Sequence, residues 1–356
     1  GDEAEYTTAI SHIYAAYVAV SNYAWLTDHD DLAISYSGYF HSMWNQAIFY
    51  PEQFKEITDE VLEALKAVRD KSPVAISAGE RLYTRWDYRK MFDIMASAGI
   101  EGIDFNNDVA EYCTTEHDEE FYRSLGEYAK SRGVAICQAH APFPSSYVEE
   151  DKSAKRFEEI VQGIKNAAYL GAPMIVVHPC VHLDFAVEGN PEILFDYNLN
   201  FYKKLIPVAR ECGIKIAIEN IGRVSITSTP ERLNKLFDTL CDPVFTVCFD
   251  VGHCLLQGVD PAEAIRAIGE RLVDGCTHVH DNNGDRDTHT LPYYGKVGWE
   301  SVMKALADID YAGDLNYEAS AFIKDIPVAL YEDGLTYMAK VGKYLIERFK
   351  FYKENK

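Results

Sequence analysis

A short unit recurs along this chain: an amphipathic stretch ends at a glycine, and an apolar, β-branched run follows directly. Gly133, Gly171 and Gly213 each stand at such a junction. A glycine that ends a helix just before a strand is typical of an αβ connection. Most of the apolar runs are continuous rather than alternating, as parallel strands buried on both faces require. The pattern therefore limits the chain to a parallel α/β architecture.

Eight runs qualify as strands, and the stretches between them carry helix signals such as Asp118 at one start and Pro261 at the first position of another. The predicted strands are Val74–Ser77, Gly102–Phe105, Val134–Ala139, Met174–His178, Lys215–Glu219, Phe245–Asp250, Gly275–His280 and Asp314–Glu318. Eight βα units of roughly 30 to 40 residues predict a (β/α)₈ TIM barrel. The competing architecture is a doubly wound open sheet, which normally ends at five or six strands.

The barrel accounts for only part of the 356 residues. We assign 71–356 to a TIM-barrel catalytic domain and 1–70 to an N-terminal helical extension. Residues 52–70 have the apolar spacing of an amphipathic helix, and an aromatic-rich segment precedes them. The extension could pack on the barrel, cover its mouth as a lid or form a subunit contact in a homo-oligomer, and the sequence leaves these alternatives open.

Charge and cysteine usage narrow the class of partner. The chain holds 34 Lys and Arg against 56 Asp and Glu, a net charge of −22. Such acidity disfavours nucleic acid and anionic membranes as partners. The eight cysteines stand singly, and the first residues lack the basic start of a signal peptide. We therefore expect a cytoplasmic protein with reduced thiols.

Acids and imidazoles stand at the predicted carboxyl ends of seven consecutive strands. They are Asp104, His140, His178, Glu219, Asp250 (with His253 just beyond it), His280 and Glu318. In TIM barrels the functional side chains lie at this end of the strands. Carboxylates gathered in one mouth require a compensating cation, and mixed Asp, Glu and His ligands suit Mn²⁺, Mg²⁺, Co²⁺ or Zn²⁺. The constellation predicts a divalent metal site.

The segment from His278 to His289 is the richest in such groups. His278 and His280 alternate along one strand and therefore share a face. His280 is nearer the rim and is the expected ligand, whereas His278 is either a further site residue or an ordinary core histidine. The polar loop that follows places Arg286, Asp287 and His289 over the mouth, although its composition also suits a solvated turn.

Six motifs in the predicted barrel resemble the xylose-isomerase-like barrel superfamily over about residues 72–350. They are Gln138-Ala139-His140-Ala141-Pro142, Val177-His178-Pro179, Ile218-Glu219-Asn220, Phe249-Asp250-Val251-Gly252-His253, the His280 segment and Tyr317-Glu318. That group joins sugar isomerases and epimerases, inosose dehydratases and apurinic-site endonucleases. The His280 segment, with Gly295 to Trp299 downstream, most resembles the sugar isomerase and epimerase members.

The resemblance implies one divalent ion, Mn²⁺ by preference, with four ligands: Glu219, Asp250, His280 and Glu318. It implies substrate contacts for His253 and Arg286, as in ketose epimerases. His140, His178, Asp287 and His289 match further ligands of the trinuclear endonuclease site, and we assign them to substrate binding. Ser225 departs from the epimerase pattern, which has a further Glu there, so the identity of the sugar stays open.

These assignments predict an isomerase or epimerase acting on a carbohydrate. The ion would stabilise an enediolate while Glu219 and Glu318 remove and return a proton next to the carbonyl. The absence of a Lys/Arg cluster near the rim favours an unphosphorylated substrate. If the enediolate expels a leaving group, the enzyme is a lyase, such as an inosose-type dehydratase. An apurinic-site endonuclease-like activity and a non-catalytic carbohydrate-binding barrel are weaker alternatives.

Overall fold

The computed structural model describes residues 88–106, 118–222, 225–324, 327 and 330–356. The predicted strand Val74–Ser77 and the predicted extension 1–70 lie outside the described residues, so the domain boundary stays a prediction. The described residues up to 323 and from 332 onward belong to one compact unit. No helix in this described part of the chain is both long and apolar enough to cross a membrane.

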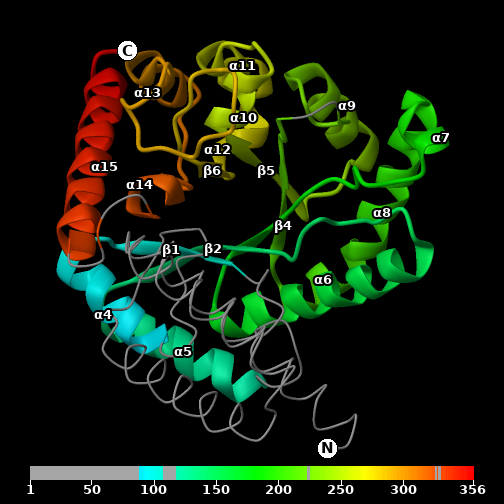
Figure 1. The fold of residues 1–356 in the computed structure, drawn as a ribbon, viewed down its shortest axis with the longest axis horizontal. Coiled ribbons are helices and arrows are strands. Elements are labelled where there is room, and N and C mark those ends of the chain that lie inside the picture. Colours follow the sequence, from blue (N-terminus) through cyan, green and yellow to red (C-terminus); the bar gives the residue numbers. More distant parts are fainter. Residues whose placement is uncertain (1–87, 107–117, 223–224, 325–326, 328–329) are drawn as a thin grey trace, which may run out of the picture. The chain divides into compact units, whose positions relative to one another are not determined.

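Six parallel strands form one sheet whose spatial order is the chain order (Figure 1). They are β1 (Gly102–Asn106), β2 (Ala135–His140), β3 (Met174–Val177), β4 (Lys215–Glu219), β5 (Phe245–Asp250) and β6 (Cys276–His278). Although β1 and β6 are at opposite ends of this order, Asp104 of β1 and His278 of β6 lie 3.2 Å apart, from Oδ2 to Nε2. The sheet therefore curls round on itself, as barrel closure requires.

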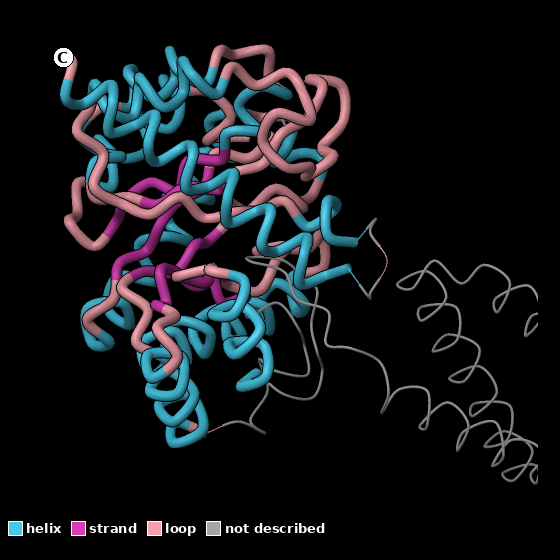
Figure 2. The backbone as a smooth tube through the Cα atoms, turned by 90° about the vertical axis from the view of Figure 1, so that its left-hand side faces the viewer, coloured by secondary structure: helices cyan, strands magenta, loops and turns pink. Residues whose placement is uncertain are grey.

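Helices surround the strands, as the tube view shows (Figure 2). They are α4 (Tyr88–Ala98), α5 (Glu119–Ser131), α6 (Glu150–Leu170), α7 (Phe185–Glu188), α8 (Pro191–Cys212), α9 (Pro230–Leu240), α10 (Val251–Leu256), α11 (Pro261–Ile268), α12 (Glu270–Val273), α13 (Trp299–Asp308), α14 (Ser320–Lys324) and α15 (Tyr331–Glu354). Helices cover the outer face of the sheet, and side chains fill its inner face. The strands are therefore buried on both faces, as their continuous apolar sequences indicated.

The helix ends follow the sequence signals. The Asp118 carboxylate accepts a hydrogen bond from the Phe121 amide at the start of α5. Gly171 and Gly213 end α6 and α8 in the left-handed conformation, with φ of 91° and 66°. This backbone shape favours glycine because a Cβ would clash with the carbonyl that follows. The αβ junctions are thus set by local sequence.

The predicted strand Asp314–Glu318 is the main difference from expectation. Only Tyr317 pairs with the sheet, through a parallel bridge to Val279 just beyond β6. At its start the Asp314 carbonyl accepts hydrogen bonds from the side-chain hydroxyls of Thr277 and Tyr311. These side-chain donors occupy an acceptor that a regular ladder would use, so the segment joins the barrel without forming a full strand.

Part of the barrel interior is apolar. Val176, Ala217, Cys248 and Cys276 form a buried cluster from four consecutive strands, β3 to β6. The seven cysteines among the described residues are all free thiols. This cluster packs the barrel interior along β3 to β6.

Candidate metal centre

The carboxyl ends of the strands bring most of the predicted site residues to one place. Glu219 ends β4, Asp250 ends β5, and His278 ends β6. Glu318 follows the bridge that joins Tyr317 to the sheet. All four are buried. Buried carboxylates that lie close together repel each other, and here the three carboxylates of Glu219, Asp250 and Glu318 surround the imidazole of His278.

His278 is the centre of this cluster. Its Nδ1 lies 3.3 Å from Glu219 Oε2, 3.6 Å from Glu318 Oε2 and 3.8 Å from Asp250 Oδ2. His280, the histidine that the sequence favoured, donates from Nε2 to Asp250 Oδ1 at 3.0 Å. The geometry therefore brings His278 among all three carboxylates and His280 against one of them.

The central cluster fits a cation. The carboxylate oxygens of Glu219 and Nδ1 of His278 are buried and make no aligned hydrogen bond. Oε2 of Glu219 nevertheless lies 3.3 Å from Nδ1 of His278 and 2.8 Å from Nε2 of His178. Buried polar atoms are costly when left unsatisfied. Asp250, His278 and Glu318 each offer one ligand atom within 4.8 Å of the others, and so do Glu219, Asp250 and His253. Oxygen and imidazole donors without a thiolate suit Mn²⁺, Mg²⁺, Co²⁺ or Zn²⁺.

The electrostatics of the cluster show how strongly it demands positive charge. Burial disfavours the charged form of Glu219, but the imidazoles of His178 and His278 outweigh burial and hold its pKa well below the usual range. Burial also opposes the charged form of His278, yet the carboxylates of Glu318 and Glu219 raise its pKa well above the usual value. The site therefore favours a positive charge.

His140 and His178 extend the site toward β2 and β3. Their Nε2 atoms lie 3.0 Å apart, and Nε2 of His178 is 2.8 Å from Glu219 Oε2. His140 donates from Nδ1 to the Ala141 carbonyl, which orients its ring. Burial lowers the pKa of His178 despite the nearby Glu219.

A second cluster lies beside the first and is built on α10 and the loop after β6. Its members are His253, His280, Asp287 and His289, whose ligand atoms lie within 4.8 Å of one another. The Asp287 carboxylate accepts from Nε2 of His253 at 3.1 Å and from Nε2 of His289 at 3.0 Å. The rings of His280 and His289 stack with centroids 4.1 Å apart.

The charges in this second cluster are complementary. His253 donates from both ring nitrogens, to the Asn220 carbonyl and to Asp287. Burial opposes the imidazolium, but Asp250 and Asp287 raise the pKa of His253 well above its usual value. Conversely, His253 and His289 hold the pKa of the Asp287 carboxyl far below its usual range despite partial burial.

Asp281, which the sequence analysis did not single out, organises the loop that carries Asp287 and His289. Oδ1 accepts from the Asn282 and Val297 amides at 2.9 and 3.0 Å. Oδ2 accepts from the Tyr293 amide at 3.0 Å and the Trp299 indole N–H at 2.8 Å. The Gly295–Trp299 motif was the sequence signal for this role. It contains the Val297 amide and the Trp299 indole N–H, and such donors need an acceptor when they are buried.

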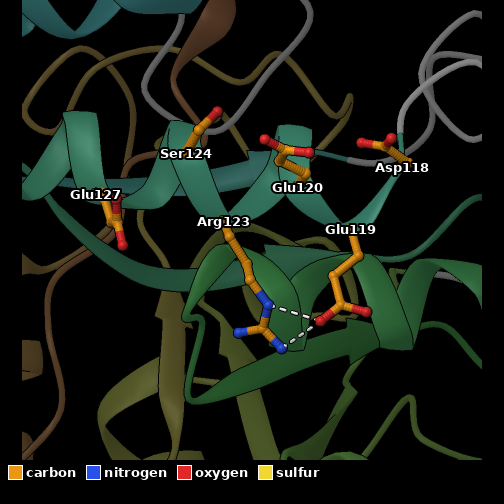
Figure 3. A pocket seen from close by; sticks show the side chains of 6 residues that line it. All are labelled: Asp118, Glu119, Glu120, Arg123, Ser124 and Glu127. Atoms are coloured by element: carbon orange, nitrogen blue, oxygen red, sulfur yellow. Dashed lines mark hydrogen bonds and ion pairs between the residues drawn. The ribbon is translucent and has the colours of Figure 1, made fainter.

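Arg286, a predicted substrate contact, and Ser225, where the sequence departs from the epimerase pattern, both lie outside the two clusters. Arg286 is exposed on the loop, outside both clusters of the described structure. Ser225 is buried and accepts from the Thr227 amide at 3.0 Å, so its hydroxyl is used within its own turn. A hollow along α5 is also separate from the strand-end groups: its lining side chains come from α5 and its N-cap, and Arg123 pairs with Glu119 at 2.7 Å (Figure 3).

Comparison with known proteins agrees with this geometry. Residues 92–341, well over half of the chain, match the family model described as xylose isomerase-like TIM barrel. The chain belongs to this family. The six described strands and the bridge at Tyr317 are therefore the observed part of the family's barrel, and the predicted fold class is confirmed.

Similar proteins include an uncharacterized protein, y4fM, of Sinorhizobium fredii, which is 28% identical over 66% of this chain and 83% of its own. An inosose dehydratase of Clostridium perfringens is 26% identical over 50% of this chain and 66% of its own. Among solved structures, a D-tagatose 3-epimerase-like protein superposes with a TM-score of 0.59 at 22% identity, over 70% of this chain and 90% of its own. Epimerases and dehydratases are thus among the similar proteins.

Proposed function

We propose that this protein is a divalent-metal-dependent sugar epimerase or isomerase, with Glu219, Asp250, His278 and Glu318 as the metal ligands. The supporting observation is the buried set of three carboxylates around Nδ1 of His278, with the unsatisfied atoms of Glu219 and His278 facing one another. His280 then belongs to the neighbouring cluster. This assignment keeps three of the four ligands that the motifs implied. It replaces the fourth, His280, by His278, which stands two residues earlier in the chain.

When bound, the ion would polarise the substrate carbonyl and stabilise negative charge on its oxygen. Glu219 and Glu318 come from well-separated parts of the chain, and their carboxylates lie 3.3 and 3.6 Å from Nδ1 of His278. One carboxylate takes the proton from the carbon next to the carbonyl, and the other returns it. Return to the opposite face of the same carbon gives epimerisation, whereas return to the adjacent carbon gives isomerisation.

The neighbouring groups would bind the substrate hydroxyls. His178 has a fifth of its side chain exposed and faces Glu219, so it can contact a substrate at the mouth. His253 and Asp287 supply a charged donor and a charged acceptor beside it. Such an arrangement suits a neutral polyol, which offers hydroxyls as both donors and acceptors.

Hydrogen exchange into the solvent tests this proposal. Ketoses, inososes and 3-oxo-glycosides are incubated with the Mn²⁺-loaded protein in deuterated water, and deuterium at carbon is measured by mass spectrometry. We expect incorporation with the wild-type protein and none with Glu219→Gln. Glu300→Gln, which changes an exposed carboxylate paired with Arg348, is the matched control and retains exchange. Near-normal turnover by metal-loaded Glu219→Gln would contradict the scheme.

A second candidate is a dehydratase, favoured by the similarity to inosose dehydratases. The same proton abstraction would then be followed by loss of a β-hydroxyl as water, with cleavage of one C–H and one C–O bond. The assay separates the two: an epimerase product has the mass of its substrate, and a dehydratase product is lighter by one water. An abasic-site DNA duplex in the same panel tests the endonuclease alternative, which the net charge of −22 disfavours.

A further inference from the structure

A polar layer lies inside the barrel at the level of His278. Asp104 Oδ2 accepts from Gln138 Nε2 at 2.7 Å and from His278 Nε2 at 3.2 Å. Gln138 Oε1 in turn accepts from Asn316 Nδ2 at 2.6 Å. All four side chains are buried. They come from β1, β2, β6 and the segment before Tyr317, so the layer spans the interior of the barrel.

An irregularity in the backbone of β1 places the Asp104 side chain in this polar layer. The pairing of β1 with β2 runs in step at Ile103 and Ile136, then skips a residue so that Asp104 faces Gln138. A bulge of this kind redirects side chains and is common beside functional sites. Here it aligns the Asp104 carboxylate with the Gln138 amide, and the same carboxylate oxygen also receives His278.

The hydrogen bond to Asp104 decides which nitrogen of His278 is available. A carboxylate only accepts, so Nε2 of His278 must carry the proton. When a metal ion takes the place of the proton on Nδ1, the lone pair that binds it is on this atom, which lies among Glu219, Glu318 and Asp250. Carboxylate partners fix metal-binding histidines in this way and raise their basicity.

A purely structural role for the layer does not account for its unsatisfied atoms. Oδ1 of Asp104 and Nδ1 of His278 are both buried without a hydrogen-bond partner. A network formed only for packing would leave neither atom unpaired, because each unpaired buried polar atom costs free energy. The layer is therefore better explained as a means of orienting the imidazole of His278.

We propose that Asp104 is a positioning residue for the metal centre: it holds the His278 ring with Nε2 protonated, so that Nδ1 is the ligand atom. Gln138 and Asn316 hold Asp104 in turn. The inference rests on the proposed metal-dependent function, but it concerns metal binding rather than turnover. It predicts an effect that can be measured with Zn²⁺ alone and without any substrate.

The test compares Asp104→Ala, Asp104→Asn and Thr246→Val by competition of each protein with a chromophoric chelator for Zn²⁺. Asp104→Ala removes the acceptor, and we expect the Kd for Zn²⁺ to rise about 10- to 100-fold. Asp104→Asn can keep an oxygen at the Oδ2 position, so we expect it to recover most of that loss. Thr246→Val removes a buried hydroxyl contact near the start of β5, away from the metal centre, and should leave the Kd unchanged.

Nitrogen-15 NMR of the histidines in the Zn²⁺-loaded protein gives a readout that a merely structural role would not alter. We expect a His278 signal, identified by its loss in His278→Gln, with a protonated Nε2 and a metal-shifted Nδ1. A protonated Nδ1, or equal Kd values for wild type and Asp104→Ala, would overturn the inference while leaving proton exchange on sugars to be judged separately. Failure of the wild-type protein to bind Zn²⁺, Mn²⁺ or Co²⁺ would overturn both proposals.

Discussion

The carboxylate of Asp281 gathers four N–H donors, and Asp281→Asn tests how much that arrangement contributes to stability. Each carboxylate oxygen accepts two of the bonds. An amide keeps one acceptor oxygen and turns its NH₂ toward the other two donors. Two buried donors are then unsatisfied, at about 1–2 kcal/mol each, so we expect a loss of about 2–4 kcal/mol in the free energy of unfolding.

Urea denaturation followed by far-ultraviolet circular dichroism measures this loss. Asp285→Asn is the matched control, because Asp285 is exposed on the same loop and the same chemical change there should cost less than about 0.5 kcal/mol. If the loop opens locally without global unfolding, hydrogen exchange at the Tyr293 and Val297 amides reports it instead. A destabilisation of about 3 kcal/mol corresponds to a loss of protection of about 100-fold.

The reasoning would be refuted by a definite result. If Asp281→Asn matches Asp285→Asn in unfolding free energy and the two amides keep their protection, the carboxylate does not organise the loop. The positions of Asp287 and His289 would then need another explanation. Trp299→Phe gives an intermediate test, since it removes one donor and leaves the carboxylate with three.

Two further predictions concern the clusters themselves. Dialysis against a chelator should lower the Tm. Mn²⁺ or Zn²⁺ at about 100 times its Kd should then restore about 2.7 kcal/mol to the free energy of unfolding. An unchanged Tm in differential scanning calorimetry would contradict the metal centre. A methyl group at position 252 would overlap the ring of His280, so Gly252→Ala should displace that ring and reduce kcat/KM at least tenfold, whereas Gly258→Ala, at a left-handed turn with open space, should affect stability alone.

Much of the fold was predictable because each strand and junction carries its own local signal. The runs 215–219 and 245–250 are strands over the predicted bounds. The glycines that follow helices mark the αβ turns. The segment 314–318 was not predictable, because its shape depends on hydroxyl donors from Thr277 and Tyr311 rather than on its own residues.

The site was predictable as a set of strand ends but not in its inner geometry. Alternation places His278 and His280 on one face, yet the tilt of the strands sets which of them is level with Glu219 and Glu318. That tilt is a property of the closed sheet and has no signature within a single strand. The same holds for Asp104, whose partner His278 is distant in the chain and meets it only through curvature of the sheet.

The polar layer also has a consequence for the order of events during folding. Asn316 and Gln138 are separated by 178 positions in the chain, and His278 and Asp104 by 174, so their contacts form only when the sheet curls round. Contacts of such long range form late, since loop closure must precede them. Metal capture at Nδ1 of His278 should therefore follow barrel closure, and the ion would slow unfolding of the finished barrel rather than nucleate its assembly.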